Sequence, residues 1–290
     1  MSDYLIKATA FNGQVRAYAI QSTDLVNEAC RRQDTWPTAS AALGRSLTVS
    51  AMMGAMLKGE DQITVKIEGN GPMGAIITDS NANGDVRGYV KNPHVDFESN
   101  DQNKLDVKRA VGTEGTLSVV KDLGLKNNFT GQVPIVSGEV SEDFTYYFVS
   151  SEQVPSAVGA GVLVDTDYSI AAAGGFILQM LPGAEEETIT HVEEKLGKVP
   201  AISTLIQQGK TPEDILGIFF EGEEWHVLEQ QDVRYQCKCS KDRVAQAISS
   251  LGNEEIDSMI EEDGGAEATC HFCNEVYDLS AKELELLKQN

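Results

Sequence analysis

Four of the five cysteines in this 290-residue chain form two close pairs near its C-terminus. Cys237 and Cys239 make a CxC motif, and Cys270 and Cys273 make a CxxC motif. Four thiolates arranged in this way can complete a tetrahedral zinc shell, with each sulfur ~2.3 Å from the metal. The same pairs can oxidise to disulfides. The motif therefore predicts a metal site in one redox state and two short covalent loops in the other.

The chemistry of these sulfurs favours a redox-sensitive site. Thiolates are the nucleophiles that peroxide attacks, and metal binding keeps cysteines as thiolates. A sulfenic acid on one sulfur can be resolved by the other cysteine of its pair, and on proximity alone the expected disulfides are Cys237–Cys239 and Cys270–Cys273. Oxidation would remove the ligands and the folding free energy that the metal supplies. A purely structural zinc ribbon is the alternative reading of the same four residues.

Two other residues are further candidates for a functional or metal-binding role. Cys30 lies far from the pairs in sequence, and we interpret it as an incidental thiol. His271 sits inside the CxxC motif and has a ring nitrogen that can bind zinc. Four sulfurs already fill a tetrahedral shell, so we expect one zinc ion held by cysteines alone.

Composition limits the function classes. The net charge of −22 disfavours nucleic acid and anionic membranes as partners, because phosphate binding needs clustered Lys and Arg. The first residues lack the pattern of a signal peptide, and no apolar run approaches the ~20 residues of a membrane span. We expect a cytoplasmic protein, where a reducing environment favours metal or redox roles for cysteine over a permanent disulfide framework.

The pattern of elements predicts an α+β fold in three parts. Residues 1–180 read as a β-sheet domain packed with helices, 181–231 as an acidic helical linker, and 232–290 as a small zinc-binding domain. β-branched and aromatic runs predict strands, and the Asn-Gly at 83–84 predicts a hairpin turn. Strands are expected at residues 63–67, 73–78, 116–120 and 144–149, and helices at residues 38–57 and around 151–163.

The linker and the last unit both need outside support. A Thr-Pro-Glu-Asp start at residues 211–214 predicts the third of three linker helices, and its apolar residues at 215–220 must pack on a neighbouring domain. The last unit has about sixty residues of modest apolar content, and such units usually need a metal or disulfide staple.

The chain shows no hydrolase constellation. Its four histidines are not arranged as HExxH, and no GxSxG is present. The glycine-rich run at residues 69–74 lacks the Lys-Ser/Thr of a phosphate loop and is interpreted as a turn. We expect no enzymatic activity.

The CxC and CxxC segments, at residues 235–240 and 270–277, resemble those of the redox-regulated heat-shock holdases known as 33 kDa chaperonins. Segments at residues 71–90, 131–136 and 173–183 resemble the first domain of that family, so the likeness spans the chain. It implies an ATP-independent cytoplasmic chaperone that is inactive when reduced and zinc-bound. It also implies that oxidation forms two disulfides, releases zinc, unfolds the last domain and linker, and yields a homodimer that holds unfolding clients against aggregation.

Two other functions fit the cysteines less well. A zinc-ribbon nucleic-acid module is disfavoured because residues 232–290 carry six Lys and Arg against thirteen Asp and Glu, a net charge of −7. A thiol–disulfide oxidoreductase would place its CxxC at a helix N-terminus in a βαβ unit. Here the CxxC lies near the C-terminus beside a second cysteine pair.

Overall fold

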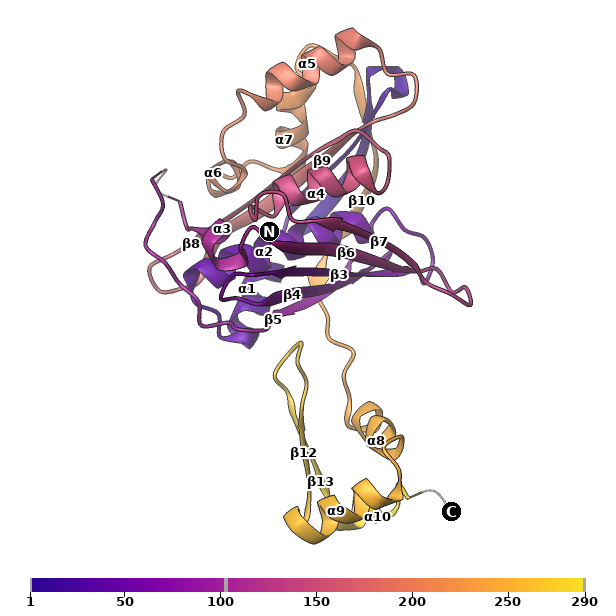
Figure 1. The fold of residues 1–290 in the computed structure, drawn as a ribbon. Helices are drawn as coiled ribbons and strands as arrows, with labels where there is room; N and C mark the ends of the chain where they lie inside the picture. The colour runs from indigo at the N-terminus through magenta and orange to yellow at the C-terminus, as the bar shows by residue number, and fades with distance from the viewer. Residues whose placement is uncertain (1, 102–103, 289–290) are drawn as a thin grey trace. The chain divides into compact units, whose positions relative to one another are not determined.

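The computed structural model describes residues 2–101 and 104–288. The chain divides into two compact units, residues 1–236 and residues 237–290, and each is described by itself (Figure 1). Within the described residues, no helix combines the length and apolarity that crossing a membrane requires.

Five antiparallel strands form the first sheet of the large unit. They are β1 (Tyr4–Ala10), β2 (Val15–Gln21), β8 (Ser156–Val164), β9 (Ile170–Met180) and β10 (Trp225–Asp232). Their order across the sheet is β10-β1-β2-β9-β8, and a short 3-10 turn, η1 (Phe11–Gly13), joins β1 to β2. Strand β10, near the end of the large unit, pairs with β1 at its beginning, so the two ends of this unit lie in one sheet.

A second, six-stranded sheet completes the unit. Its strands are β3 (Gln62–Gly69), β4 (Ala75–Asn81), β5 (Asp85–Val90), β6 (Gly115–Asp122), β7 (Phe129–Pro134) and the two-residue β11 (Arg234–Tyr235). The order is β11-β5-β4-β3-β6-β7, and only the β11–β5 pair is parallel. The predicted strands at 63–67 and 116–120 are confirmed as parts of β3 and β6, and the one at 73–78 is confirmed from residue 75 onward, in β4. The turn at 83–84 joins β4 to β5.

Helix α2 (Pro37–Gly54) contacts both sheets and forms the centre of the main core. Nearly every residue of α2 is buried, as expected for a helix that is apolar around most of its circumference. The helix predicted over residues 38–57 is thus confirmed. Three shorter helices border this core: α1 (Thr23–Gln33), α3 (Val107–Val111) and α4 (Ser141–Ser150).

Two predicted elements are wrong in type. The expected strand at 144–149 lies within α4, where Phe144, Tyr147 and Phe148 are buried at the i, i+3, i+4 spacing of one helix face. The expected helix around 151–163 is strand β8, which pairs with β9. Gly159 lies against the Phe176 ring, where an added Cβ would come within 2.3 Å of a ring carbon, so its missing side chain reflects close packing in a sheet.

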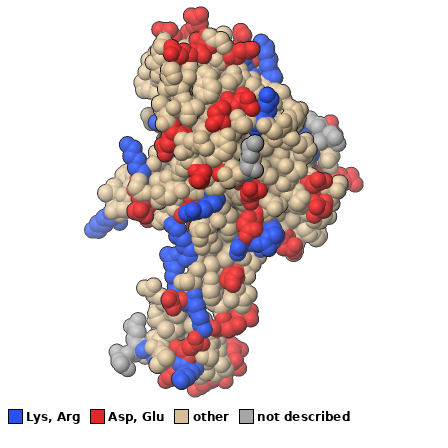
Figure 2. Space-filling model, turned by 180° about the vertical axis from the view of Figure 1, so that it is seen from behind, with Lys and Arg blue, Asp and Glu red and all other residues tan. Residues whose placement is uncertain are grey.

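The acidic linker segment folds onto the first sheet. Its helices α5 (Glu186–Leu196), α6 (Ile202–Gln207) and α7 (Pro212–Phe219) cover the face of the sheet that points away from α2 (Figure 1). Phe219 is fully buried, with its ring 4.6 Å from that of Phe176. Thr211 is the N-cap of α7, as the sequence predicted, and it also forms a capping box with Asp214. On the face drawn in Figure 2, acidic side chains gather at the end that carries α5.

The small unit has little apolar core of its own. It contains α8 (Lys241–Ser249), α9 (Asn253–Asp263), the hairpin β12 (Gly265–Thr269) and β13 (Val276–Ser280), and α10 (Ala281–Glu285). Its apolar cluster has four buried members, Ile248, Ile256, Leu279 and Leu284. A core of this size rarely holds a domain folded without a covalent or metal staple.

Candidate metal centre

The four paired cysteines come from two loops of the small unit. Cys237 and Cys239 lie in the segment before α8, and Cys270 and Cys273 lie in the turn between β12 and β13. Local hydrogen bonds shape both loops. The Arg243 guanidinium donates to Lys238 O at 2.8 Å, and Cys270 N donates to Glu275 O at 2.9 Å. The sequence therefore folds each pair into a tight loop with its sulfurs directed inward.

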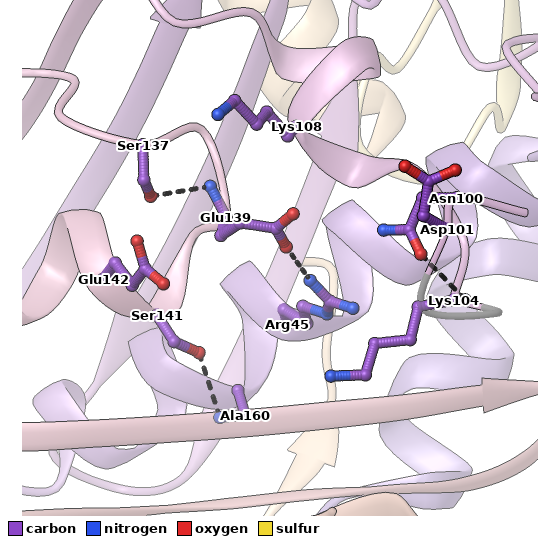
Figure 3. Close-up of a pocket in the computed structure, with 10 residues that line it drawn as sticks. All are labelled: Arg45, Asn100, Asp101, Lys104, Lys108, Ser137, Glu139, Ser141, Glu142 and Ala160. Carbon is purple, nitrogen blue, oxygen red and sulfur yellow. Dashed lines mark hydrogen bonds and ion pairs between the residues drawn. The ribbon is translucent and has the colours of Figure 1, made fainter.

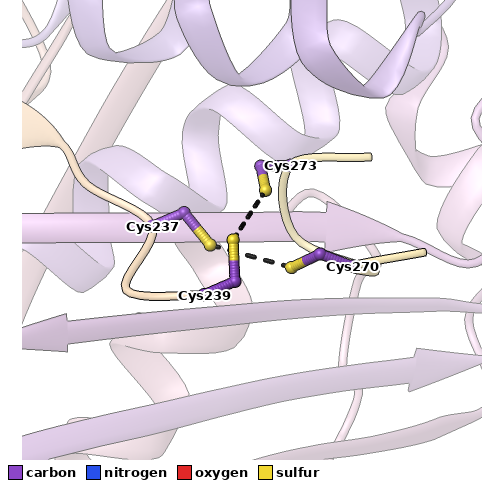
Figure 4. A group of neighbouring side chains, drawn as sticks. All are labelled: Cys237, Cys239, Cys270 and Cys273. Atoms are coloured by element: carbon purple, nitrogen blue, oxygen red, sulfur yellow. Dashed lines mark hydrogen bonds between the residues drawn. The ribbon is translucent and has the colours of Figure 1, made fainter. Parts of the chain in front are cut away.

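The two pairs meet sulfur to sulfur (Figure 4). Cys237 Sγ lies 3.7 Å from Cys270 Sγ, and Cys239 Sγ lies 3.3 Å from Cys273 Sγ. All four sulfurs fall within 4.8 Å of one another. Ligands ~2.3 Å from a tetrahedral ion would be about 3.8 Å apart, so the cluster has the dimensions of a zinc–tetrathiolate shell. Four sulfur donors in a tetrahedral arrangement are typical of zinc or iron–sulfur sites.

Comparison with known proteins adds the identity of the family. The family model described as Hsp33 protein matches residues 3–280. The chain belongs to the Hsp33 family. The match includes both sulfur loops as well as the two-sheet unit, so it covers every element that positions the cluster.

Relatives agree along their whole lengths. A 33 kDa chaperonin of Oceanobacillus iheyensis is 65% identical over 289 residues, which is 100% of each chain. That of Bacillus subtilis is 63% identical over 286 residues, covering 99% of this chain and 98% of the relative. The crystal structure of the 33 kDa chaperonin from Thermotoga maritima matches with a TM-score of 0.93 and 38% identity, covering 99% of this chain and 98% of the other. Chaperonins of the Hsp33 family are not enzymes, in agreement with the prediction.

Burial works against ionisation of two of the sulfurs, those of Cys239 and Cys273. It raises the pKa of the Cys239 thiol and of the Cys273 thiol above their ordinary values. Cys273 is the most buried of the four, with 6% of its surface exposed. A divalent cation reverses this preference, because a coordinating thiol is deprotonated outright. Metal binding at this cluster would therefore be coupled to the loss of protons from the thiols.

One neighbour of the cluster was not foreseen from the sequence. The Tyr277 hydroxyl, on β13, donates a hydrogen bond to Cys239 Sγ at 3.1 Å. This contact raises the pKa of Tyr277 above its ordinary value, because the hydrogen bond to Cys239 favours the protonated hydroxyl. The two residues are 38 positions apart, and no local pattern links them. Only the hairpin register, which sets Tyr277 opposite Ala268, brings the ring to the sulfurs.

Cys30 and His271, the two further candidates from the sequence, lie outside the cluster. Cys30 is buried in α1, where its thiol contacts Ser40 O at 3.8 Å and burial raises its pKa to about 11. It belongs to the core of the large unit and not to the sulfur cluster. His271 is exposed and is not among the residues whose ligand atoms converge.

A polar pocket of about 550 Å³ opens in the large unit beside α2 and α4 (Figure 3). At its centre Arg45 donates to Glu139 at 3.0 Å. The remaining charged side chains that line it are Asp101, Lys104, Lys108 and Glu142. The three positive and three negative side chains of this lining balance one another. The lining contains no cysteine or histidine, and none of its residues belongs to the metal-ligand cluster.

Proposed function

We propose that this Hsp33-family protein is a redox-regulated, ATP-independent holdase that binds thermally unfolding and oxidatively damaged proteins and prevents their aggregation. The observation that carries the proposal is the convergence of four sulfurs in a unit with a four-residue apolar core. The folding stability of such a small unit depends on whether its sulfurs bind a metal or one another. Family membership supplies the chaperone class, and the cluster supplies a reason for regulation.

In the reduced state, Cys237, Cys239, Cys270 and Cys273 would hold one zinc ion. Bound zinc supplies cross-linking of the two loops, which in small zinc-binding peptides amounts to ~10–16 kcal/mol of apparent binding free energy. Without that linkage, the buried side chains of Ile256, Leu279 and their two neighbours are the main apolar support of the fold. The reduced unit is then folded and the protein inactive.

Oxidation by hydrogen peroxide would open the shell in two steps. One thiolate attacks a peroxide oxygen, the O–O bond breaks and hydroxide leaves, so the sulfur loses two electrons and becomes a sulfenic acid. The partner thiolate then attacks that sulfur, forms the S–S bond and expels a second hydroxide. We propose the pairs Cys237–Cys239 and Cys270–Cys273. Each disulfide removes two ligands, so the second one leaves no thiolate shell for the metal.

The linker provides the surface that activation exposes. Helices α5–α7 bury a row of apolar residues on the first sheet, including Leu205, Ile215 and Phe219. If the segment leading to Cys237 loosens, these helix faces and the sheet beneath them become available to unfolded clients. The exposed acids of the linker would keep the active form soluble. We propose that this form is a homodimer in the cytoplasm and that it binds neither nucleic acid nor membranes.

Light scattering of a thermally unfolding client protein tests the proposal. The reduced, zinc-loaded protein should leave client aggregation unchanged, and the same protein after peroxide at elevated temperature should suppress it. A variant with all four paired cysteines changed to serine separates oxidation from loss of metal, because it cannot form disulfides. Equal suppression by the reduced and oxidised wild-type protein would overturn redox regulation. Absence of suppression in both would overturn the holdase assignment.

A further inference from the structure

The cluster has a fifth participant. We propose that Tyr277 is a positioning residue of the sulfur centre, whose hydroxyl holds Cys239 in its ligand orientation and lowers the reactivity of that sulfur toward hydroperoxides. The inference rests on the proposed function, since it assumes that the four sulfurs bind a metal and are then oxidised. It concerns a residue outside the cysteine set.

Geometry singles out this hydroxyl. The Tyr277 Oη to Cys239 Sγ distance is 3.1 Å, and the ring is only partly exposed on the hairpin that also carries Cys270 and Cys273. Tyr277 therefore links the CxxC hairpin to the CxC loop through a hydrogen bond between two side chains. Partners that orient metal ligands from outside the shell typically change metal affinity 10–100-fold when they are removed.

The bond also changes the chemistry of the sulfur. A hydrogen bond to an ionised acceptor is stronger than one between neutral groups, and it draws charge away from the thiolate. In the attack on peroxide that charge is transferred to the breaking O–O bond, so the hydrogen bond weakens as the transition state forms. Tyr277 therefore stabilises the starting thiolate more than the transition state, which slows oxidation.

Tyr277→Phe is the direct test, because it removes the hydroxyl and keeps the ring. In cobalt-substituted full-length protein, we expect the thiolate-to-cobalt charge-transfer band to move to lower energy, since Cys239 becomes a stronger electron donor. We expect zinc affinity to fall about tenfold. Peroxide oxidation at saturating zinc should quicken by roughly fivefold, the effect of about one hydrogen bond.

Two control variants separate this role from a structural one. Ser280→Ala removes the cap of α10, where Ser280 and Glu283 form a capping box, and destabilises the same unit without touching a sulfur. Tyr146→Phe removes a hydroxyl from an exposed tyrosine of the large unit. Both should leave the charge-transfer band in place. The inference fails if Tyr277→Phe also leaves the band and the oxidation rate unchanged, or if Ser280→Ala shifts the band equally.

Measurements on the wild-type protein distinguish failure of the proposed function from failure of the proposed role of Tyr277. Wild-type protein that binds no cobalt or zinc through its cysteines overturns the proposed function. Wild-type protein that binds metal and suppresses aggregation after oxidation, beside a Tyr277→Phe variant with an identical spectrum, overturns only the role of Tyr277.

Discussion

Arg234 Nε donates a hydrogen bond to Asp85 Oδ1 at 2.8 Å, which fixes the chain three residues before Cys237. Backbone bonds reinforce this contact, from Arg234 N to Gly84 O at 3.0 Å and from Gln236 N to Val86 O at 2.9 Å. Residues 233–236, here called the docked segment, are thus the last part of the large unit before the sulfur loops. We expect their stability to set how far unfolding that begins at Cys237 would travel toward β10 and the linker.

Gly84→Ala should release the docked segment. Gly84 has φ +80°, and an added Cβ would lie 2.2 Å from Asp232 O, so the substitution brings both backbone strain and a clash. We expect ~1–3 kcal/mol of local destabilisation, seen as faster hydrogen exchange at the amides of residues 234 and 236.

Gly124→Ala is the matched control for that variant. Gly124 has φ +68° with no atom within 4 Å of the added Cβ, so it carries the strain without the clash. Its effect should not reach the docked segment. Unchanged exchange at residues 234 and 236 in Gly84→Ala would show that the close approach to Asp232 does not hold the segment.

Phe219→Ala should loosen the linker without oxidation. The side chain is fully buried between α7 and the first sheet, and truncating a buried Phe costs ~3–5 kcal/mol. We expect faster proteolysis between residues 184 and 220 and partial suppression of client aggregation by the reduced protein. Leu228→Ala, at a side chain that is 65% exposed on β10, is the control and should change neither. A protease-sensitive Phe219→Ala variant with no gain in suppression would separate linker unfolding from activity.

Disulfide mapping distinguishes two pairings. The sequence favours Cys237–Cys239 and Cys270–Cys273, whereas the short sulfur contacts join Cys237 to Cys270 and Cys239 to Cys273. We expect the sequential pairs, because opening of the unit during oxidation separates the two loops but leaves each pair together. Mass spectrometry of the oxidised, non-reduced protein decides the question. Predominant cross-loop pairs would show that oxidation is complete before the unit opens.

Cys273→Ser should abolish tight zinc binding and unfold the small unit, because it removes the most buried of the four ligands. Zinc content and the backbone NMR dispersion of residues 237–290 measure the effect. Cys30→Ser, at a buried thiol outside the cluster, should leave zinc content unchanged even where it lowers the stability of the large unit. Loss of zinc in Cys30→Ser would place Cys30 in the metal site.

The contribution of Asp3 to the stability of the large unit should rise as the pH falls from 7 toward 4. Burial raises the pKa of Asp3 to about 6, above its ordinary 3.8, and its buried Oδ1 has no hydrogen-bond partner. Its protonated form is therefore favoured in the folded state, and the stability it contributes is greatest below pH 3.8 and lost as pH rises through 6. The full difference is about 3 kcal/mol. Asp3→Asn should flatten this part of the pH profile of urea unfolding; an unchanged profile would contradict it.

The sequence predicted those features that depend on residues close to one another along the chain. The cysteine cluster, the cap of α7 and the buried helix α2 all follow from patterns within a few residues. Strand β10 was not predicted, because its mostly exposed residues Trp225–Asp232 have no buried face of their own and become a strand by pairing with β1, more than two hundred positions earlier. The Tyr277 contact depends equally on a hairpin register. In α4 and β8, aromatic and small-residue composition favoured the wrong element, and tertiary packing decided the outcome.

We propose that loss of the thiolate shell turns the protein on. The most direct measurement follows one peroxide-treated sample at elevated temperature and records zinc release, proteolysis of residues 184–231 and suppression of client aggregation over time. We expect the three to rise together, with proteolysis and suppression following zinc release. Complete zinc release with no gain in linker proteolysis, or full suppression before any zinc is released, would contradict the account.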